Sequence, residues 1–126
     1  MPRTRIDIDD RRIKIDVIVA NTSNTSMNNT YSALIDTGSV ESLISEKIVN
    51  DLKLSKSGDF VTIVDMNGNE IKSDRYKCYI LFNGHTKTFD MNIGLINRKG
   101  LDIIIGMDIL ELSEIDIKNG IFTISS

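Results

Sequence analysis

Apolar and polar residues alternate along much of the chain. The clearest run covers residues 13–19, whose apolar positions are Ile13, Ile15, Val17 and Val19. Residues 89–95 repeat the alternation, with Phe89, Met91, Ile93 and Leu95 at the apolar positions. A period of two residues places successive side chains on opposite faces of a β-strand. The pattern therefore predicts strands with one buried face at 13–19 and 89–95, and a shorter one at 115–118.

Three Asn-Gly pairs lie between the apolar runs, at residues 67–68, 83–84 and 119–120. Asn and Gly both tolerate a positive φ, which the two central residues of a type I′ hairpin turn require. Three such pairs in a short chain predict three hairpins, and hence an antiparallel, all-β architecture.

Two segments depart from the strand pattern and predict short helices. In residues 45–53, Ser45 is a typical N-cap, and Ile48 and Leu52 would share one face of the helix. The second candidate helix covers 107–112 and follows Gly106, with Asp108 near its start, where a carboxylate suits the helix dipole.

Residues 21–30 are polar and of low complexity, and they contain Asn-x-Ser/Thr sequons at Asn21, Asn24 and Asn28. Glycosylation needs a secretory route, and the N-terminal residues show no apolar segment of a signal peptide. We therefore interpret 21–30 as a mobile surface loop that joins two strands.

Length and composition narrow the function classes. The chain has 126 residues, 40% of them apolar and 26% charged, which predicts a single domain over residues 1–126. No apolar run is long enough to span a membrane, so we expect a cytoplasmic protein that binds no membrane. With 15 basic and 18 acidic residues and no long basic run, nucleic acid is not the expected partner. A single Cys78 and a single His85 favour neither a disulfide nor a metal site, and we interpret them as a packing residue and an exposed residue.

One short segment carries candidate chemistry. The apolar run 33–35 ends in Asp36-Thr37-Gly38-Ser39, a tetrad of a type that occurs by chance in about one chain in a hundred of this length. On the tetrad alone, two interpretations stay open. The carboxylate can serve catalysis, or Asp36 and Thr37 can simply begin a turn in which Gly38 takes a positive φ.

The residues around the tetrad resemble the retroviral-like aspartic proteases, or retropepsins. Residues 34–45 read LIDTGSVESLIS and precede the first predicted helix, and 102–110 read DIIIGMDIL, the second hallmark of that family. With the closing hairpin at 115–122, the resemblance covers about residues 11–124.

Two positions depart from the viral members of the family. The viral enzymes usually carry an acidic residue directly after the tetrad and an arginine after the second glycine, and the two pair. Here these positions hold Val40 and Met107. The chain is therefore more similar to the bacterial, retroelement and ubiquitin-shuttle-protein branches.

The resemblance implies a small closed acid-protease β-barrel and an aspartic endopeptidase that needs no cofactor and no metal. Asp36 would pair with Asp36 of a second copy in a homodimer, and the two carboxylates would activate a water against a polypeptide substrate. Thr37 would brace the two loops across the dimer axis, and Gly38 would let the backbone bond its own carboxylate. Ile105 and Gly106 would form the second motif.

The resemblance also implies a flap hairpin over the site, and the best candidate is residues 61–72. Its tip would be Met66, Asn67, Gly68 and Asn69. A surface hairpin with no gating role is the alternative.

Ser39 bears on the pH dependence of the expected reaction. Its hydroxyl lies three residues after Asp36 and could donate to the outer carboxylate oxygen, which favours the anion and predicts an optimum below neutrality. The alternative is that Ser39 only caps the following turn.

A rival function comes from another class of protein. A non-catalytic dimerisation or peptide-binding module could keep the same fold and motif. A third interpretation, a small barrel for an unrelated ligand, requires the tetrad to be accidental.

Overall fold

The computed structural model describes residues 3–5, 7–9, 12–64, 67–82, 88–96, 100–112, 114–118 and 121–125. The strands in these residues are β1 (Arg3–Arg5), β2 (Asp7–Asp9), β3 (Arg12–Ala20), β4 (Asn28–Ile35), β5 (Leu43–Ile44), β6 (Lys56–Val64), β7 (Glu70–Phe82), β8 (Thr88–Leu95), β9 (Ile103–Ile105), β10 (Glu114–Lys118) and β11 (Ile121–Ser125). The helices are α1 (Glu46–Leu52) and α2 (Met107–Leu110).

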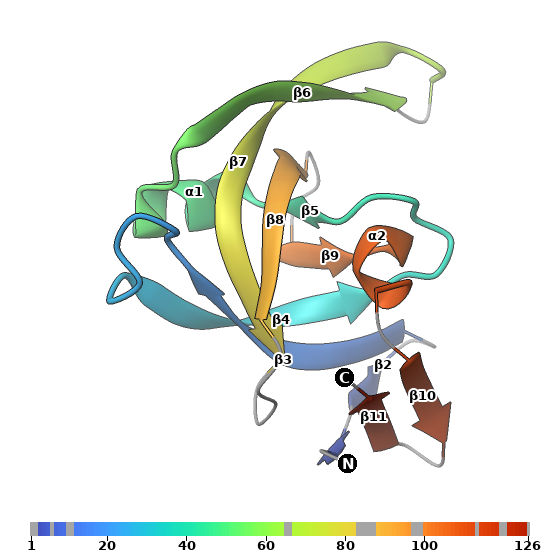
Figure 1. Ribbon diagram of the computed structural model, residues 1–126. Coiled ribbons are helices and arrows are strands. Elements are labelled where there is room, and N and C mark those ends of the chain that lie inside the picture. The colour runs from blue at the N-terminus through green and yellow to red at the C-terminus, as the bar shows by residue number, and fades with distance from the viewer. Residues whose placement is uncertain are drawn as a thin grey trace.

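The larger sheet closes into a barrel. Its strand order is β2-β3-β4-β9-β5-β8-β7-β6, and an additional pairing of β3 with β7 joins the two sides. The strands from β3 around to β7 therefore form the closed barrel, while β2 and β6 lie outside the ring (Figure 1). The predicted all-β class, with a small closed barrel and short helices, is confirmed. The expected antiparallel pairing is wrong at two places in the barrel, because β4 pairs with β9 and β5 with β8 in parallel.

The barrel interior is lined by the apolar faces that the alternation predicts. In β3, Ile15, Val17 and Val19 are buried while Asp16 is exposed. In β8, Phe89 and Ile93 are buried. Phe89 packs edge-on against the ring of Phe82 from β7, with ring centroids 5.8 Å apart.

The three predicted hairpins are present, but the β6–β7 connection is not the predicted two-residue Asn-Gly turn, because residues 65–69 separate its last pair. β6 pairs with β7 up to Val64↔Glu70, around a turn that contains Gly68 with φ 81°. β7 pairs with β8, and β10 pairs with β11, both antiparallel. The turn residues 83–87, which include His85, and 119–120 lie outside the described residues.

The first helix matches its predicted start. The Ser45 side chain accepts a hydrogen bond from the Ile48 N–H, and the helix ends at Lys53 in the left-handed region, with φ 50°. The second helix is shorter than the predicted 107–112, because it stops at Leu110 and Glu111 and Leu112 form a turn.

The predicted surface loop 21–30 is wrong in two respects: it ends earlier than predicted, and its first residue is buried. Residues 28–30 belong to β4 and pair with residues 18–20 of β3. Asn21 is buried, and its side-chain amide donates to the carbonyls of Leu52 and Lys53 at the end of α1. A side chain that satisfies helix carbonyls fixes the start of this segment against the end of α1.

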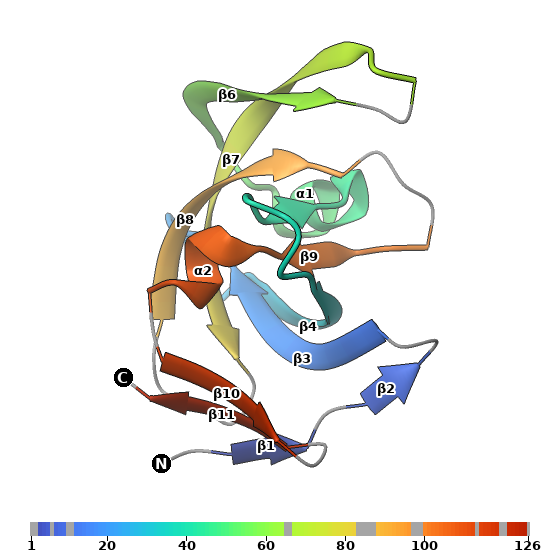
Figure 2. The same cartoon turned by 90° about the vertical axis from the view of Figure 1, so that its right-hand side faces the viewer.

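A smaller sheet of order β1-β11-β10 joins the two ends of the chain (Figure 2). Across the described residues, no helix has the length and apolar character that crossing a membrane requires.

Candidate active site

Asp36 lies at the end of a buried strand. β4 pairs in parallel with β9, with Ile35 opposite Ile105, and the Asp36 N–H donates to the Ile105 carbonyl at 2.9 Å. Ala33 and Ile105 are fully buried, whereas Asp36 is half-buried. The carboxylate of Asp36 therefore lies at the barrel surface, on a backbone position that the pairing with β9 holds in place.

The Asp36 carboxylate is held by its own loop. The Gly38 N–H donates to Asp36 Oδ1 at 2.9 Å, and a Cβ at Gly38 would lie 3.3 Å from that oxygen. Gly38 is not among the described glycines with positive φ, so the close approach, rather than an unusual turn, explains this residue. The contact is the one that the family resemblance implied.

The second motif, around Gly106, packs against the loop that follows Asp36. A Cβ at Gly106 would lie 2.7 Å from the Ser39 carbonyl oxygen and 2.8 Å from that of Glu41. The Met107 N–H donates to the Ser39 carbonyl at 2.8 Å, and the Asp108 N–H donates to the Val40 carbonyl at 3.1 Å. The start of α2 thus binds the backbone of the segment that follows Asp36.

Asp108 and Ser42 add a side-chain connection between the same two segments. The carboxylate of Asp108 accepts from the Ser42 N–H at 2.9 Å and from the Ser42 hydroxyl at 2.6 Å. The Ser42 Oγ in turn accepts from the Gly106 N–H at 2.9 Å, and Ser42 is 1% exposed. Sequence reasoning assigned Asp108 only to the helix dipole and missed this role.

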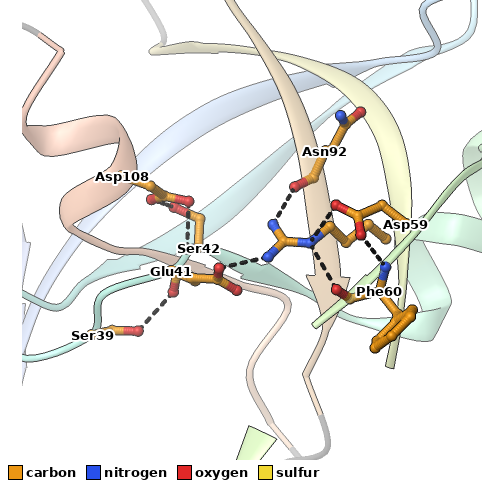
Figure 3. A network of polar contacts seen from close by, with 8 residues as sticks. Ser39, Glu41, Ser42, Asp59, Phe60, Asn92 and Asp108 are labelled. Atoms are coloured by element: carbon orange, nitrogen blue, oxygen red, sulfur yellow. Dashed lines mark hydrogen bonds and ion pairs between the residues drawn. The ribbon is translucent and has the colours of Figure 1, made fainter. Parts of the chain in front are cut away.

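Ser39 does not make the predicted bond to the carboxylate. Its hydroxyl donates to the Glu41 carbonyl at 2.7 Å (Figure 3). A hydroxyl has one proton to donate, so it cannot serve Asp36 at the same time. The predicted hydrogen bond is wrong, and the turn-capping alternative describes the structure.

The position that follows the tetrad carries no charge, and a different ion pair lies close by. Val40 is 78% exposed. Arg75, a residue of β7, donates a hydrogen bond from Nη2 to Glu41 Oε1 at 2.6 Å, and the two side chains form an ion pair. Sequence reasoning missed Arg75 because it lies in a polar stretch of β7, far along the chain from the tetrad.

The structure brings Thr37 and the other tetrad residues together with Ile105 and Gly106, and Thr37 is exposed. The predicted flap residues lie on a separate element. Asn67, Gly68 and Asn69 form the exposed tip of the β6–β7 hairpin, on the same side of the barrel as the Asp36 loop in Figure 1, and Met66 lies outside the described residues.

A pocket of about 290 Å³ lies against the inner part of this hairpin. It is lined by residues 71–74 of β7, by Leu95 and Ile96, and by Glu46 at the start of α1.

Cys78 is a packing residue, as predicted. It is fully buried in β7, and burial raises the pKa of its thiol to about 12. Within the described ranges, no group of three His, Cys, Asp or Glu side chains is placed to hold a metal ion.

Comparison with known proteins places this geometry in a family. Residues 23–112 match the family model described as "gag-polyprotein putative aspartyl protease". The fold is similar to that of a retropepsin-like aspartic protease from Rickettsia conorii, with a TM-score of 0.63, 18% identity, and coverage of 97% of this chain and 89% of the other. A comparison with curated proteins gives no match. The chain belongs to the retropepsin-like aspartic proteases.

Proposed function

We propose that the protein is an aspartic endopeptidase that works as a homodimer, with Asp36 of each copy as its catalytic residue. The observation that carries the proposal is the carboxylate of Asp36, which accepts the Gly38 N–H on a loop fixed by Gly106. A rigid, oriented carboxylate at the end of a buried strand is what general acid–base chemistry requires.

Peptide hydrolysis by this chemistry needs two carboxylates. Two such groups about 3 Å apart share one proton, because both cannot ionise at that distance. The ionised member removes a proton from the attacking water, and the protonated member polarises the scissile carbonyl. The chain has a single Asp-Thr-Gly segment, so a second copy related by a two-fold axis would supply the other carboxylate.

Thr37 and the hairpin have supporting roles in this proposal. The exposed Thr37 would lie at the two-fold axis and brace the two loops. The tip of the β6–β7 hairpin (Asn67, Gly68, Asn69) would cover a polypeptide bound over Asp36. The pocket beside residues 71–74 offers apolar surface from Ile71, Leu95 and Ile96 near this hairpin.

The test is Asp36→Asn, which keeps the size of the side chain and removes the proton acceptor. Cleavage of an unfolded protein mixture should fall by about 10²–10⁴-fold. The far-UV spectrum and the sedimentation coefficient should stay unchanged. Asp16→Asn is the matched control, because Asp16 is exposed on β3.

Two outcomes would contradict the proposal. Retained cleavage by Asp36→Asn would place the chemistry elsewhere. A wild-type protein that binds a statine-type peptide but cleaves nothing would be a non-catalytic peptide-binding module.

A further inference from the structure

Arg75 contacts three separate segments of the chain through one guanidinium. Its Nη2 donates to Glu41 Oε1 at 2.6 Å, its Nη1 to the Asn92 carbonyl at 3.3 Å, and its Nε to the Phe60 carbonyl at 3.4 Å. The Nε also lies 3.5 Å from Asp59 Oδ2. These residues, which we call the Arg75 network, connect the segment after Asp36 with β6 and β8 (Figure 3).

The network depends on the shape of arginine. A guanidinium presents five N–H donors in a planar fork, and its side chain here is 21% exposed. A lysine ammonium is a point charge on a flexible stem and does not reproduce the fork. The other oxygen of Glu41, Oε2, is buried and has no hydrogen-bond partner in the described structure. Loss of Arg75 would therefore leave this carboxylate unpaired beside the loop.

Three hydrogen bonds, joined by the covalent bonds of Glu41 and Ser39, connect Arg75 with Asp36. Arg75 holds the side chain of Glu41, and the Glu41 carbonyl accepts from the Ser39 hydroxyl at 2.7 Å. The Ser39 N–H donates to the Asp36 carbonyl at 3.2 Å. A shift of the Glu41 side chain thus pulls on the loop that positions the carboxylate.

Other contacts of the hairpin are made with β8. The Ser73 Oγ accepts from the Leu95 N–H at 3.0 Å. Val61 packs so closely on Gly94 that a Cβ there would overlap with Val61 Cγ1. These contacts attach the hairpin to β8, whereas the contact of Arg75 with Glu41 reaches the Asp36 loop.

We propose that Arg75 is a positioning residue that couples the β6–β7 hairpin to the Asp36 loop. The inference rests on the proposed function, in which the hairpin covers the substrate and Asp36 activates the water. With the network intact, the hairpin and the loop keep one relative position. Without it, the hairpin keeps its attachment to β8 but loses its direct contact with the loop, so the loop is held less firmly and Asp36 spends less time in the reactive geometry.

The first experiment compares Arg75→Gln with Lys56→Gln. Both changes remove one positive charge from the hairpin, but the Lys56 side chain is exposed and forms its ion pair with the exposed Asp74, at 3.1 Å. In Arg75→Gln, kcat should fall about 10- to 100-fold while KM changes less than about threefold, because a small misplacement of a reacting group costs rate rather than binding. Lys56→Gln should leave both constants within about twofold.

The second experiment needs no catalysis. Hydrogen exchange at the amides of Gly38, Ser39 and Ser42 reports on the loop itself, since all three N–H groups are hydrogen-bonded. We expect exchange at these amides to quicken about tenfold in Arg75→Gln and to stay unchanged in Lys56→Gln.

A double variant tests whether Arg75 acts through Glu41. Glu41→Ala removes the acceptor, so combining it with Arg75→Gln should lower kcat no further than the more severe single change. Additive losses, or equal exchange rates in Arg75→Gln and Lys56→Gln, would overturn the coupling. If the loop amides quicken as expected but the wild-type protein shows no Asp36-dependent cleavage, the coupling stands and the proposed function fails.

Discussion

Gly106 lies directly against the carbonyl of Ser39. A Cβ at position 106 would approach that oxygen to 2.7 Å, while the neighbouring Met107 N–H donates to the same oxygen at 2.8 Å. The φ of Gly106 is −102°, which any residue can adopt. The requirement for glycine is therefore steric, and it comes from the loop that carries Asp36.

Gly106→Ala should displace this loop. We expect the free energy of unfolding to fall by about 1–3 kcal/mol, as in other overpacked sites, and proteolysis to be lost. Urea denaturation and the cleavage assay measure the two effects. Gly58→Ala is the control for the cleavage assay, because its φ of 89° makes the substitution costly in stability while its Cβ meets nothing within 4 Å. Full activity in Gly106→Ala would show that the loop tolerates displacement.

Asp108→Ala should be more costly than an interaction with the helix dipole can explain. It leaves the N–H and hydroxyl of Ser42 without their acceptor in a buried position, which costs about 1–3 kcal/mol. Loss of a charge at a helix start alone would cost about 0.3–1 kcal/mol. Thermal and urea unfolding beside the exposed control Asp16→Ala would separate the two values. A loss no larger than that of the control would contradict the bonding role.

Ser39→Ala should change stability and leave the pH profile alone. Its hydroxyl bonds the Glu41 carbonyl, so the loss should be about 0.5–1.5 kcal/mol of unfolding free energy. The acid limb of the pH–rate profile, measured with the dimer saturated, should not move. A shift of that limb by half a pH unit or more would mean that the hydroxyl turns to Asp36 during the reaction.

Local sequence patterns predicted the alternating strands and the start of the first helix. The alternation at Val17 and Val19 and the Ser45 cap depend on residues within a few positions of one another. Periodicity and capping act over that range, so a single sequence contains the necessary information. The Gly38 contact with Asp36 was expected from the family resemblance and not from a local pattern.

The remaining contacts required the closed barrel. Ser42 and Asp108 are 66 positions apart, and Glu41 and Arg75 are 34 apart. Strand order and register decide which polar side chains meet across such separations, and neither follows from local pattern. The prediction for the Ser39 hydroxyl was wrong for a different reason. The Asp36 carboxylate and the Glu41 carbonyl compete for its one proton, and the backbone conformation of the turn decides between them.

If the active site needs two chains, dilution should reduce the specific activity of the protein. Specific activity should fall as the concentration passes below the dimer dissociation constant, in step with the monomer fraction from analytical ultracentrifugation. Excess Asp36→Asn protein should also inhibit the wild type by forming mixed dimers with one carboxylate. Full activity in a demonstrated monomer would rule out the two-chain mechanism.

Cys78 should make the folded state less stable at alkaline pH. Its pKa rises from 9.0 to about 12 on burial, so above pH 9 the unfolded chain releases a proton that the folded chain keeps. Its contribution to stability is complete below pH 9 and is lost as the pH rises toward 12, with a limiting slope of about 1.4 kcal/mol per pH unit. In Cys78→Ala, denaturant titrations between pH 9 and 11 should show a shallower decline. Identical slopes in the two proteins would contradict the burial argument.

The attachment of the Asp36 loop to residues 105–108 also sets an order of events during synthesis. Asp36 leaves the ribosome long before the Ile105 carbonyl, the Gly106 N–H and the Asp108 carboxylate that fix its loop. Contacts between residues so far apart in sequence form late and slowly, because the intervening chain must first be ordered. A nascent chain therefore carries the aspartate without its support until residue 108 has emerged, which delays any proteolytic competence until the barrel around it has closed.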